Sequence, residues 1–113
     1  MAEFERDIIP YENHFWDFYN KLKPKVQGKF DWTISLIERT KMVPEQYFKH
    51  LTDTDGIWEI RVKLGSNIFR VFSFFDKGNI LILLNGFQKK TQKTPKKEIK
   101  KAEKLKKQYY ESR

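Results

Sequence analysis

The stretch from Ile57 to Phe87 constrains the fold more than any other part of the chain, because it reads as three strands joined by very short turns. Apolar and charged residues alternate in Ile57–Leu64 (IWEIRVKL), which is typical of a strand with one buried face. Asn67–Phe75 (NIFRVFSFF) is almost entirely apolar, as expected of a central strand, and Ile80–Phe87 (ILILLNGF) follows a polar turn. Strands joined by such short turns pair antiparallel, so the sequence predicts an antiparallel sheet.

The first turn decides which side chains face each other across this sheet. If Gly65-Ser66 is a two-residue hairpin turn, Arg61 lies directly opposite Arg70. Two opposed arginines repel each other, at a cost of a few tenths to about 1 kcal/mol, so folding gains nothing from the pair. An anion held by both planar guanidinium groups would gain from it. The alternative is that Glu59 or another acid neutralises the pair.

The second turn extends the pair to a row. If Lys77-Gly78 is that turn, Arg70 lies opposite Asn85, and Lys63 and Lys89 are predicted on the same face. One residue more in either turn would move side chains to the other face. The opposite face, assigned to the helices, collects Trp58, Ile60, Val62, Phe69, Val71, Ile80, Ile82 and Leu84, whereas Ile68, Phe72, Phe74, Leu81, Leu83 and Phe87 share the face of the arginines.

An edge strand and two helices are predicted before this sheet. Arg6–Glu12 is short and contains a proline, which is typical of an edge strand. Asn13 can cap a helix that continues through Leu22, and Pro24 suits the first turn of a second helix. The apolar stripe of the second helix consists of Val26, Phe30, Ile34 and Ile37.

A final helix begins at Thr94, as its cap, with Pro95 in the first position, and continues as a lysine-rich segment to residue 113. The chain of 113 residues contains no repeat or linker, which indicates a single domain over residues 1–113. We therefore predict an α+β fold: a small antiparallel sheet, two N-terminal helices packed on one face, and a basic C-terminal helix over residues 94–113.

The charge is distributed very unevenly. Residues 1–88 contain 12 basic and 12 acidic residues, whereas residues 89–113 contain 11 basic and 3 acidic residues, which accounts for the whole net charge of +8. Such asymmetry indicates an anionic partner, which could be nucleic acid, an anionic membrane or an acidic protein. The alternative is a lysine-rich helix face that only keeps the protein soluble.

Several functional classes have no support in the sequence. The chain has no cysteine, and His14 and His50 lack metal-ligand spacing, so we expect no metal or other cofactor. No apolar run approaches 18 residues and the N-terminus lacks a signal-peptide core, so we expect a cytoplasmic protein without a membrane partner.

Three motifs, WEIR, FRV and GFQKKTQKTP, occur in this order within Gly56–Ile99. In these residues the chain resembles the HigB-like, phage-derived branch of the RelE/ParE toxin superfamily. The resemblance implies a RelE-like fold and the toxin of a bacterial type II toxin–antitoxin system. It further implies an mRNA interferase, which is an endoribonuclease that cleaves mRNA on the ribosome, and a helix-turn-helix antitoxin protein as partner.

By motif position, the basic active-site residues of the family correspond to Arg61 in WEIR, Arg70 in FRV, and Lys89 and Lys90 in QKKT, and the resemblance implies catalytic roles for Arg61, Arg70 and Lys89. Many relatives have HGF where this chain has NGF, and Asn85 cannot shuttle a proton as histidine can. The residues expected to contact RNA are Lys63, Asn85, Lys90, Lys93, Lys96 and Lys97.

The implied reaction uses the 2′-hydroxyl of the RNA as nucleophile and no metal. Arg61 and Arg70 suit the stabilisation of the extra charge on the phosphorane, but arginine is a poor base. A lysine among cations can have its pKa lowered and can exchange protons, which makes Lys89 the first candidate for proton transfer.

Two other functions stay open at this point. The chain could be a ParE-like toxin that inhibits DNA gyrase by binding, or a non-catalytic nucleic-acid-binding relative. The lysine block could follow ribosomal RNA, in which case binding would weaken steeply with salt, or it could receive an acidic antitoxin segment.

Overall fold

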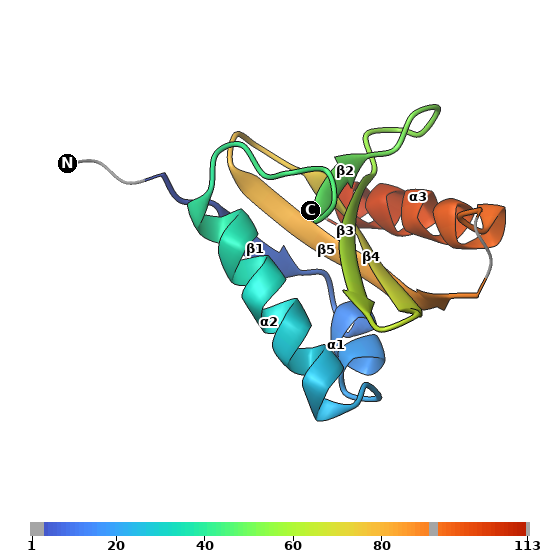
Figure 1. Ribbon diagram of the computed structural model, residues 1–113. Coiled ribbons are helices and arrows are strands. Elements are labelled where there is room, and N and C mark those ends of the chain that lie inside the picture. The colour runs from blue at the N-terminus through green and yellow to red at the C-terminus, as the bar shows by residue number, and fades with distance from the viewer. Residues whose placement is uncertain (1–3, 91–92, 113) are drawn as a thin grey trace.

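The computed structural model describes residues 4–90 and 93–112. Its centre is a five-stranded sheet in the order β1-β5-β4-β3-β2, with helices on both faces (Figure 1). In chain order the elements are β1 (Asp7–Pro10), α1 (His14–Tyr19), α2 (Pro24–Arg39), β2 (Phe48–His50), β3 (Trp58–Leu64), β4 (Asn67–Phe75), β5 (Ile80–Lys89) and α3 (Lys96–Glu111).

The predicted fold, an antiparallel sheet with two N-terminal helices packed on it, is wrong. β1 pairs parallel with β5, from Asp7 opposite Ile80 to Pro10 opposite Leu83, so the sheet is mixed. The two N-terminal helices are also unequal, because α1 already ends at Tyr19. β1 does lie at an edge of the sheet, as predicted. Its direction has no local signal, because four residues show no pattern and the strand with which they pair is far away in the sequence.

Two apolar cores lie on the two faces of the sheet. The core against α1 and α2 includes the predicted helix residues Val26, Phe30 and Ile37, all of which are buried. It also contains Phe15, Phe48, Ile60, Val62, Phe69, Val71, Leu81 and Leu83. The core against α3 contains Ile57, Phe72, Phe74, Ile82, Leu84, Phe87, Ala102 and Leu105. A sheet covered on both faces explains why β4 and β5 read as almost continuous apolar runs.

The pairing of β3 with β4 follows the predicted register. The pairs run from Trp58 opposite Ser73 to Leu64 opposite Asn67, and Arg61 lies opposite Arg70. The connecting turn contains Gly65 at a φ of 61°, a conformation that glycine adopts without steric cost. The register of β3 and β4 is therefore set locally, by a short turn in which the first residue can adopt a positive φ.

The pairing of β4 with β5 differs from the prediction in two places. Phe75 lies opposite Leu81 and Asp76 N–H donates to the Ile80 carbonyl at 2.9 Å, so the turn is longer than Lys77-Gly78 alone. The register then shifts between Val71 and Ser73, which is a β-bulge. At the bulge Leu84 and Asn85 both stand opposite Phe72, because Leu83 pairs with Ser73 and Gly86 with Val71.

These two differences change which face each β5 residue occupies. The longer turn moves Leu81 and Leu83 to the α1/α2 core and Ile82 and Leu84 to the α3 core, the reverse of the prediction. The bulge then restores the predicted face for Phe87, which packs in the α3 core. One added residue moves the following side chains of a strand to the opposite face, and a second added residue moves the side chains after it back.

α3 covers the second face of the sheet through a narrow apolar stripe. Ala102 and Leu105 are its buried side chains. Its C-terminal half is fixed by the Tyr109 hydroxyl, which donates to the Asp76 carboxylate at 2.7 Å. The helix therefore rests on the sheet with one side and leaves most of its lysines on the other, with the exception of Lys106, which donates to the Asp55 carbonyl.

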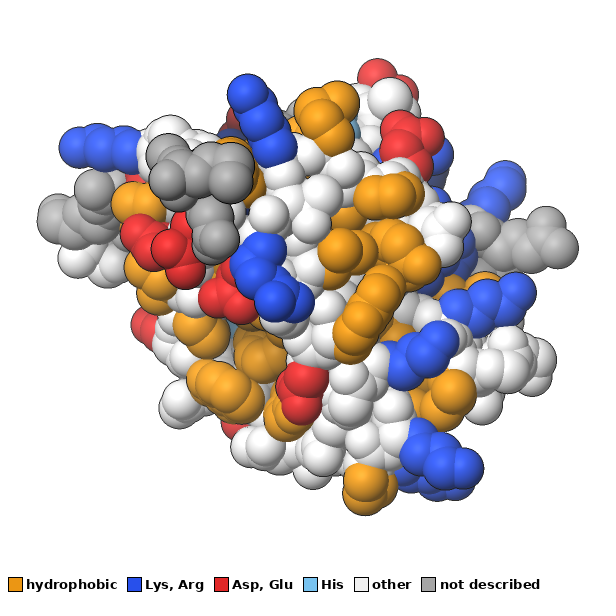
Figure 2. Space-filling view, turned by 60° about the vertical axis from the view of Figure 1, so that its left-hand side comes forward, with side chains coloured by type: hydrophobic (Ala, Val, Ile, Leu, Met, Phe, Trp, Pro, Cys, Tyr) orange, Lys and Arg blue, Asp and Glu red, His pale blue; other side chains and the backbone are white. Residues whose placement is uncertain are grey.

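The exposed surface contains several large hydrophobic side chains among the described residues. They are Ile9, Trp16, Trp32, Met42 and Tyr110, and Trp32 is 55% exposed. Figure 2 shows one face of the molecule, on which exposed hydrophobic side chains lie beside lysines and arginines. The packing of the two cores does not explain why a tryptophan is half exposed.

Candidate functional site

Arg61 and Arg70 lie side by side on the face of the sheet covered by α3, as the register predicted. Their row continues to Phe87 on β5 and not to Asn85, because the longer turn and the bulge each shift the register by one residue. In the neighbouring row Lys63 and Lys89 stand on either side of Ile68. The predicted catalytic side chains Arg61, Arg70 and Lys89 are thus brought to one region of one face.

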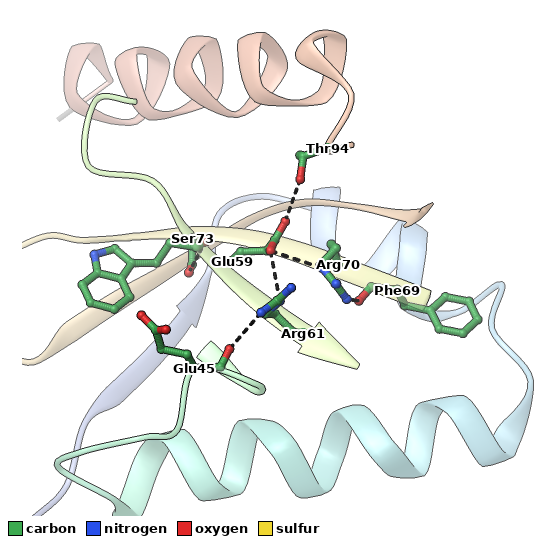
Figure 3. Close-up of polar contacts among 8 residues, drawn as sticks. Glu45, Glu59, Arg61, Phe69, Arg70, Ser73 and Thr94 are labelled. Carbon is green, nitrogen blue, oxygen red and sulfur yellow. Dashed lines mark hydrogen bonds and ion pairs between the residues drawn. The ribbon is translucent and has the colours of Figure 1, made fainter. Parts of the chain in front are cut away.

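Glu59 lies between the two arginines. Its Oε1 is 3.2 Å from Nε of Arg61 and 3.2 Å from Nε of Arg70, and its side chain is 3% exposed (Figure 3). Neither Nε has hydrogen-bond geometry toward a partner among the described residues, so the attraction is that of ion pairs. The alternative to an anion site was that Glu59 neutralises the arginine pair, and the structure confirms that Glu59 contacts both arginines. We call Glu59, Arg61, Arg70 and Lys89 the basic cluster.

Other groups hold the basic cluster in position. The Arg61 Nη1 donates to the Glu45 carbonyl at 3.1 Å, and the Arg70 Nη1 donates to the Phe69 carbonyl at 3.1 Å. The Thr94 hydroxyl donates to Oε2 of Glu59 at 3.3 Å (Figure 3). Arg61 and Glu59 are therefore tied to distant parts of the chain, whereas Arg70 bonds to the backbone of its neighbour in β4.

Thr94 reaches Glu59 because it is not the cap of α3, contrary to the prediction. Pro95 occupies the N-cap position and α3 begins at Lys96. The hydroxyl is therefore directed at the sheet rather than at the first turn of the helix. Sequence reasoning missed this contact, because 35 residues separate the two side chains.

The two arginines differ in their access to solvent. The Arg61 side chain is 27% exposed, whereas that of Arg70 is 7% exposed. Burial lowers the pKa of Arg70, and the Glu59 charge opposes this effect. A ligand would thus meet Arg61 first, with Arg70 acting from behind it.

The pKa of Lys89 is lowered as well. Partial burial is the largest cause, followed by the positive charge of Arg70, while Glu59 raises it. Lys49 on β2 contributes to the same lowering. Lys49 stands opposite Glu59 and is exposed, and no pattern in the sequence predicts that it lies near this site.

Asn85 is not open to a ligand. It is 2% exposed, and its amide nitrogen donates to the Glu98 carbonyl at 3.3 Å and to the Glu98 carboxylate at 3.1 Å. The bulge turns it toward α3 beside the row that contains Glu59. Contact between Asn85 and RNA would therefore need α3 to move.

The remaining residues expected to contact RNA are exposed lysines in four places. Lys63 lies on β3, Lys90 follows β5, Lys93 lies in the segment before α3, and Lys96 and Lys97 begin α3. Residues 91–92 of the GFQKKTQKTP motif lie outside the described residues. The lysines of the C-terminal segment therefore begin next to the basic cluster and continue along the solvent side of α3.

Arg61 also borders an open groove of about 790 Å³ between α2 and β3. We call it the edge groove, and its lining includes Lys25, Lys29, Trp32, Tyr47, Arg61 and Lys63. The basic cluster is thus continuous with a surface accessible to solvent, through one shared side chain.

Residues 4–90 and 93–112 contain neither a metal site built from His, Cys, Asp or Glu side chains nor a helix that could span a membrane. No group of three or more His, Cys, Asp or Glu side chains is arranged to hold a metal ion there. His14 lies 3.2 Å from Glu12, in an ion pair or hydrogen bond that depends on its protonation. Within the same residues no helix has the length and apolar character needed to cross a membrane.

Comparison with models of protein families identifies a family for most of the chain. A family model described as "Phage derived protein Gp49-like (DUF891)" matches residues 17–107. The matched region begins within α1 and includes all of the basic cluster and the edge groove, whereas β1 lies before it. A comparison with curated proteins gave no match.

Proposed function

The chain belongs to the Gp49-like family of phage-derived proteins, a toxin-type family related to RelE- and HigB-like toxins, and from this premise we propose that it is the HigB-like toxin of a type II toxin–antitoxin system that cleaves mRNA on the ribosome. Its partners are then ribosome-bound mRNA and a helix-turn-helix antitoxin, and it acts in the cytoplasm without a metal. The proposal takes the observed strand order and the two helix-covered faces of the sheet as its structural basis.

The observation that carries the proposal is the arrangement of charges in the basic cluster. Three cations, Arg61, Arg70 and Lys89, share one carboxylate, that of Glu59. The net charge of this region is therefore positive although Glu59 is present, and it favours an anion that reaches Arg61. A phosphate of RNA has the charge and the planar oxygen pairs that a guanidinium group binds.

The chemistry requires three tasks. The 2′-oxygen attacks the adjacent phosphorus while losing its proton, the phosphorane gains negative charge, and the 5′-oxygen leaves and takes up a proton. Arg61 stabilises the phosphorane by direct contact, and Arg70 strengthens the positive potential from a more buried position. Lys89 transfers a proton, because its lowered pKa brings it closer to neutral pH.

Glu59 is a positioning residue in this scheme. It holds both guanidinium groups near one point although they would otherwise repel each other. Its own hydrogen bond with Thr94 links that point to the segment between β5 and α3. Orientation by the ribosome supplies much of the remaining rate enhancement, since a positioned 2′-hydroxyl is a far better nucleophile.

The decisive experiment is primer extension on cellular mRNA after brief expression of the toxin. We expect codon-linked cuts for the wild type, and a loss of about 100- to 1000-fold in cutting rate for Arg61→Ala. Arg39→Ala, at the exposed C-terminal end of α2, is the matched control and should cut like the wild type. Folding of each variant is checked by circular dichroism before cutting is compared.

Other outcomes would replace the proposal. DNA damage signalling without cuts in mRNA would instead support the gyrase-inhibiting function. Salt-sensitive binding of RNA with neither effect would support a non-catalytic relative, for which the buried Asn85 in place of a histidine is the specific reason.

A further inference from the structure

The edge groove combines features that the basic cluster does not use. Along α2, Lys25, Lys29 and Trp32 follow one another at helical spacing and all are exposed. Lys63 of β3 borders the other side, and none of the described lining residues is acidic. Like charges at this spacing on a helix destabilise it slightly, so the fold itself gains nothing from the lysines.

Trp32 provides an aromatic surface inside this ring of cations. Its ring contacts that of Tyr47 edge to face, at 5.3 Å between centroids and 70° between planes. The contact holds the tryptophan at one side, yet 55% of the residue stays exposed. An aromatic ring fixed by a neighbour and open on one side is the surface on which an unstacked nucleobase packs.

Gly28 leaves the groove open between the two lysines. A Cβ atom built at this position would meet no heavy atom within 4 Å. Packing therefore does not require glycine here, and glycine weakens a helix relative to alanine. Because glycine has no side chain, the groove is deeper at this position beside Trp32.

The free edge of β3 could suggest a peptide strand as the occupant, but one contact argues against it. Lys29 Nζ donates to the Lys63 carbonyl at 3.3 Å, so an edge acceptor is already occupied. An added strand would have to displace this ammonium group. Adding a peptide strand would also leave the exposed tryptophan without a specific role.

We propose that the edge groove binds one segment of single-stranded RNA, with a base stacked on Trp32 and the flanking phosphates at Lys25 and Lys29. The segment leaves the groove past Arg61, which borders both the groove and the basic cluster. The choice of RNA rather than single-stranded DNA rests on the proposed function. The groove would hold nucleotides next to those that are cleaved.

The test is fluorescence anisotropy of a labelled 2′-O-methyl uridine oligonucleotide, which has no free 2′-hydroxyl, with the purified chain. Trp32→Ala should weaken binding by about 5- to 100-fold, the usual effect of losing one stacked base. The matched control is Trp16→Ala, because Trp16 is similarly exposed but lies on α1 away from the groove. It should bind like the wild type.

Two further variants separate the contributions to binding. Gly28→Leu should abolish binding by filling the groove while keeping every charge, and Gly28→Ala is its small control. Replacing both Lys25 and Lys29 by alanine should reduce the slope of log affinity against log salt by about 1.4, which corresponds to two phosphate contacts on a single strand. Trp32→Ala should leave that slope unchanged.

The results distinguish the groove from the nuclease. If mRNA is cut in cells but Trp32→Ala and Gly28→Leu bind the oligonucleotide like the wild type, the groove proposal is overturned and the nuclease stands. If both variants lose binding but no cutting occurs, the groove stands and the nuclease does not. Binding of an acidic peptide to the groove, with no binding of RNA, would also overturn the groove proposal.

Discussion

Glu59→Gln tests how the buried ion pairs contribute to the fold. Glutamine keeps the size of the side chain and its ability to bond with Thr94, and it removes only the charge. The Arg70 guanidinium, with a side chain that is 7% exposed, would then be buried without a counter-charge. Breaking such a buried pair from one side typically costs about 3–5 kcal/mol.

The expected loss lies at the lower end of this range, about 3 kcal/mol, because Arg61 is partly solvated and water compensates part of its charge. A urea titration followed by tryptophan fluorescence measures it. With a slope of about 1.5 kcal/mol per M, the midpoint should fall by about 2 M. Glu111→Gln is the control, because Glu111 is exposed near the end of α3.

A double-mutant cycle with Arg70→Met decides the cause. If the cost arises from the unpaired charge, Glu59→Gln combined with Arg70→Met should be clearly more stable than Glu59→Gln alone. A loss below about 1 kcal/mol for Glu59→Gln, or additive effects in the cycle, would show that the pair behaves like an exposed one and would refute this reasoning.

Three further predictions concern the neighbourhood of this site. The pKa of Lys89 is lowered in the folded chain, so between that pKa and 10.5 the unfolded chain binds more protons than the folded chain. The stability of the wild type should therefore gain a contribution as pH rises through this window. Urea titrations at successive pH values should show that Lys89→Met lacks this gain. Gly86→Ala places a Cβ atom 2.3 Å from the Phe18 ring and should cost about 1–3 kcal/mol, measured by thermal unfolding; an unchanged melting temperature would show that α1 is free to move away. Thr94→Val removes a hydrogen bond to a carboxylate and should cost about 1.5–3 kcal/mol in the wild type, but clearly less in Glu59→Gln.

The sequence predicted part of the site correctly. Opposition of Arg61 and Arg70 followed from a two-residue turn, which is a local property. The place of Glu59 between them could also be read, because residues two apart in a strand share a face. The place of Asn85 could not be predicted, because it depends on a longer turn and on a bulge inside an apolar run.

By itself the sequence determined the strands from Ile57 to Phe87, the register of the first hairpin and the concentration of charge after residue 88. Only the tertiary structure decided the parallel pairing of β1, the inversion of faces along β5 and the contact of Thr94 with Glu59. The physical reason is that hydrophobic alternation and turn residues act over a few positions. A strand that is buried on both faces has no alternation to read, and contacts between distant segments are selected by the packing of the whole domain.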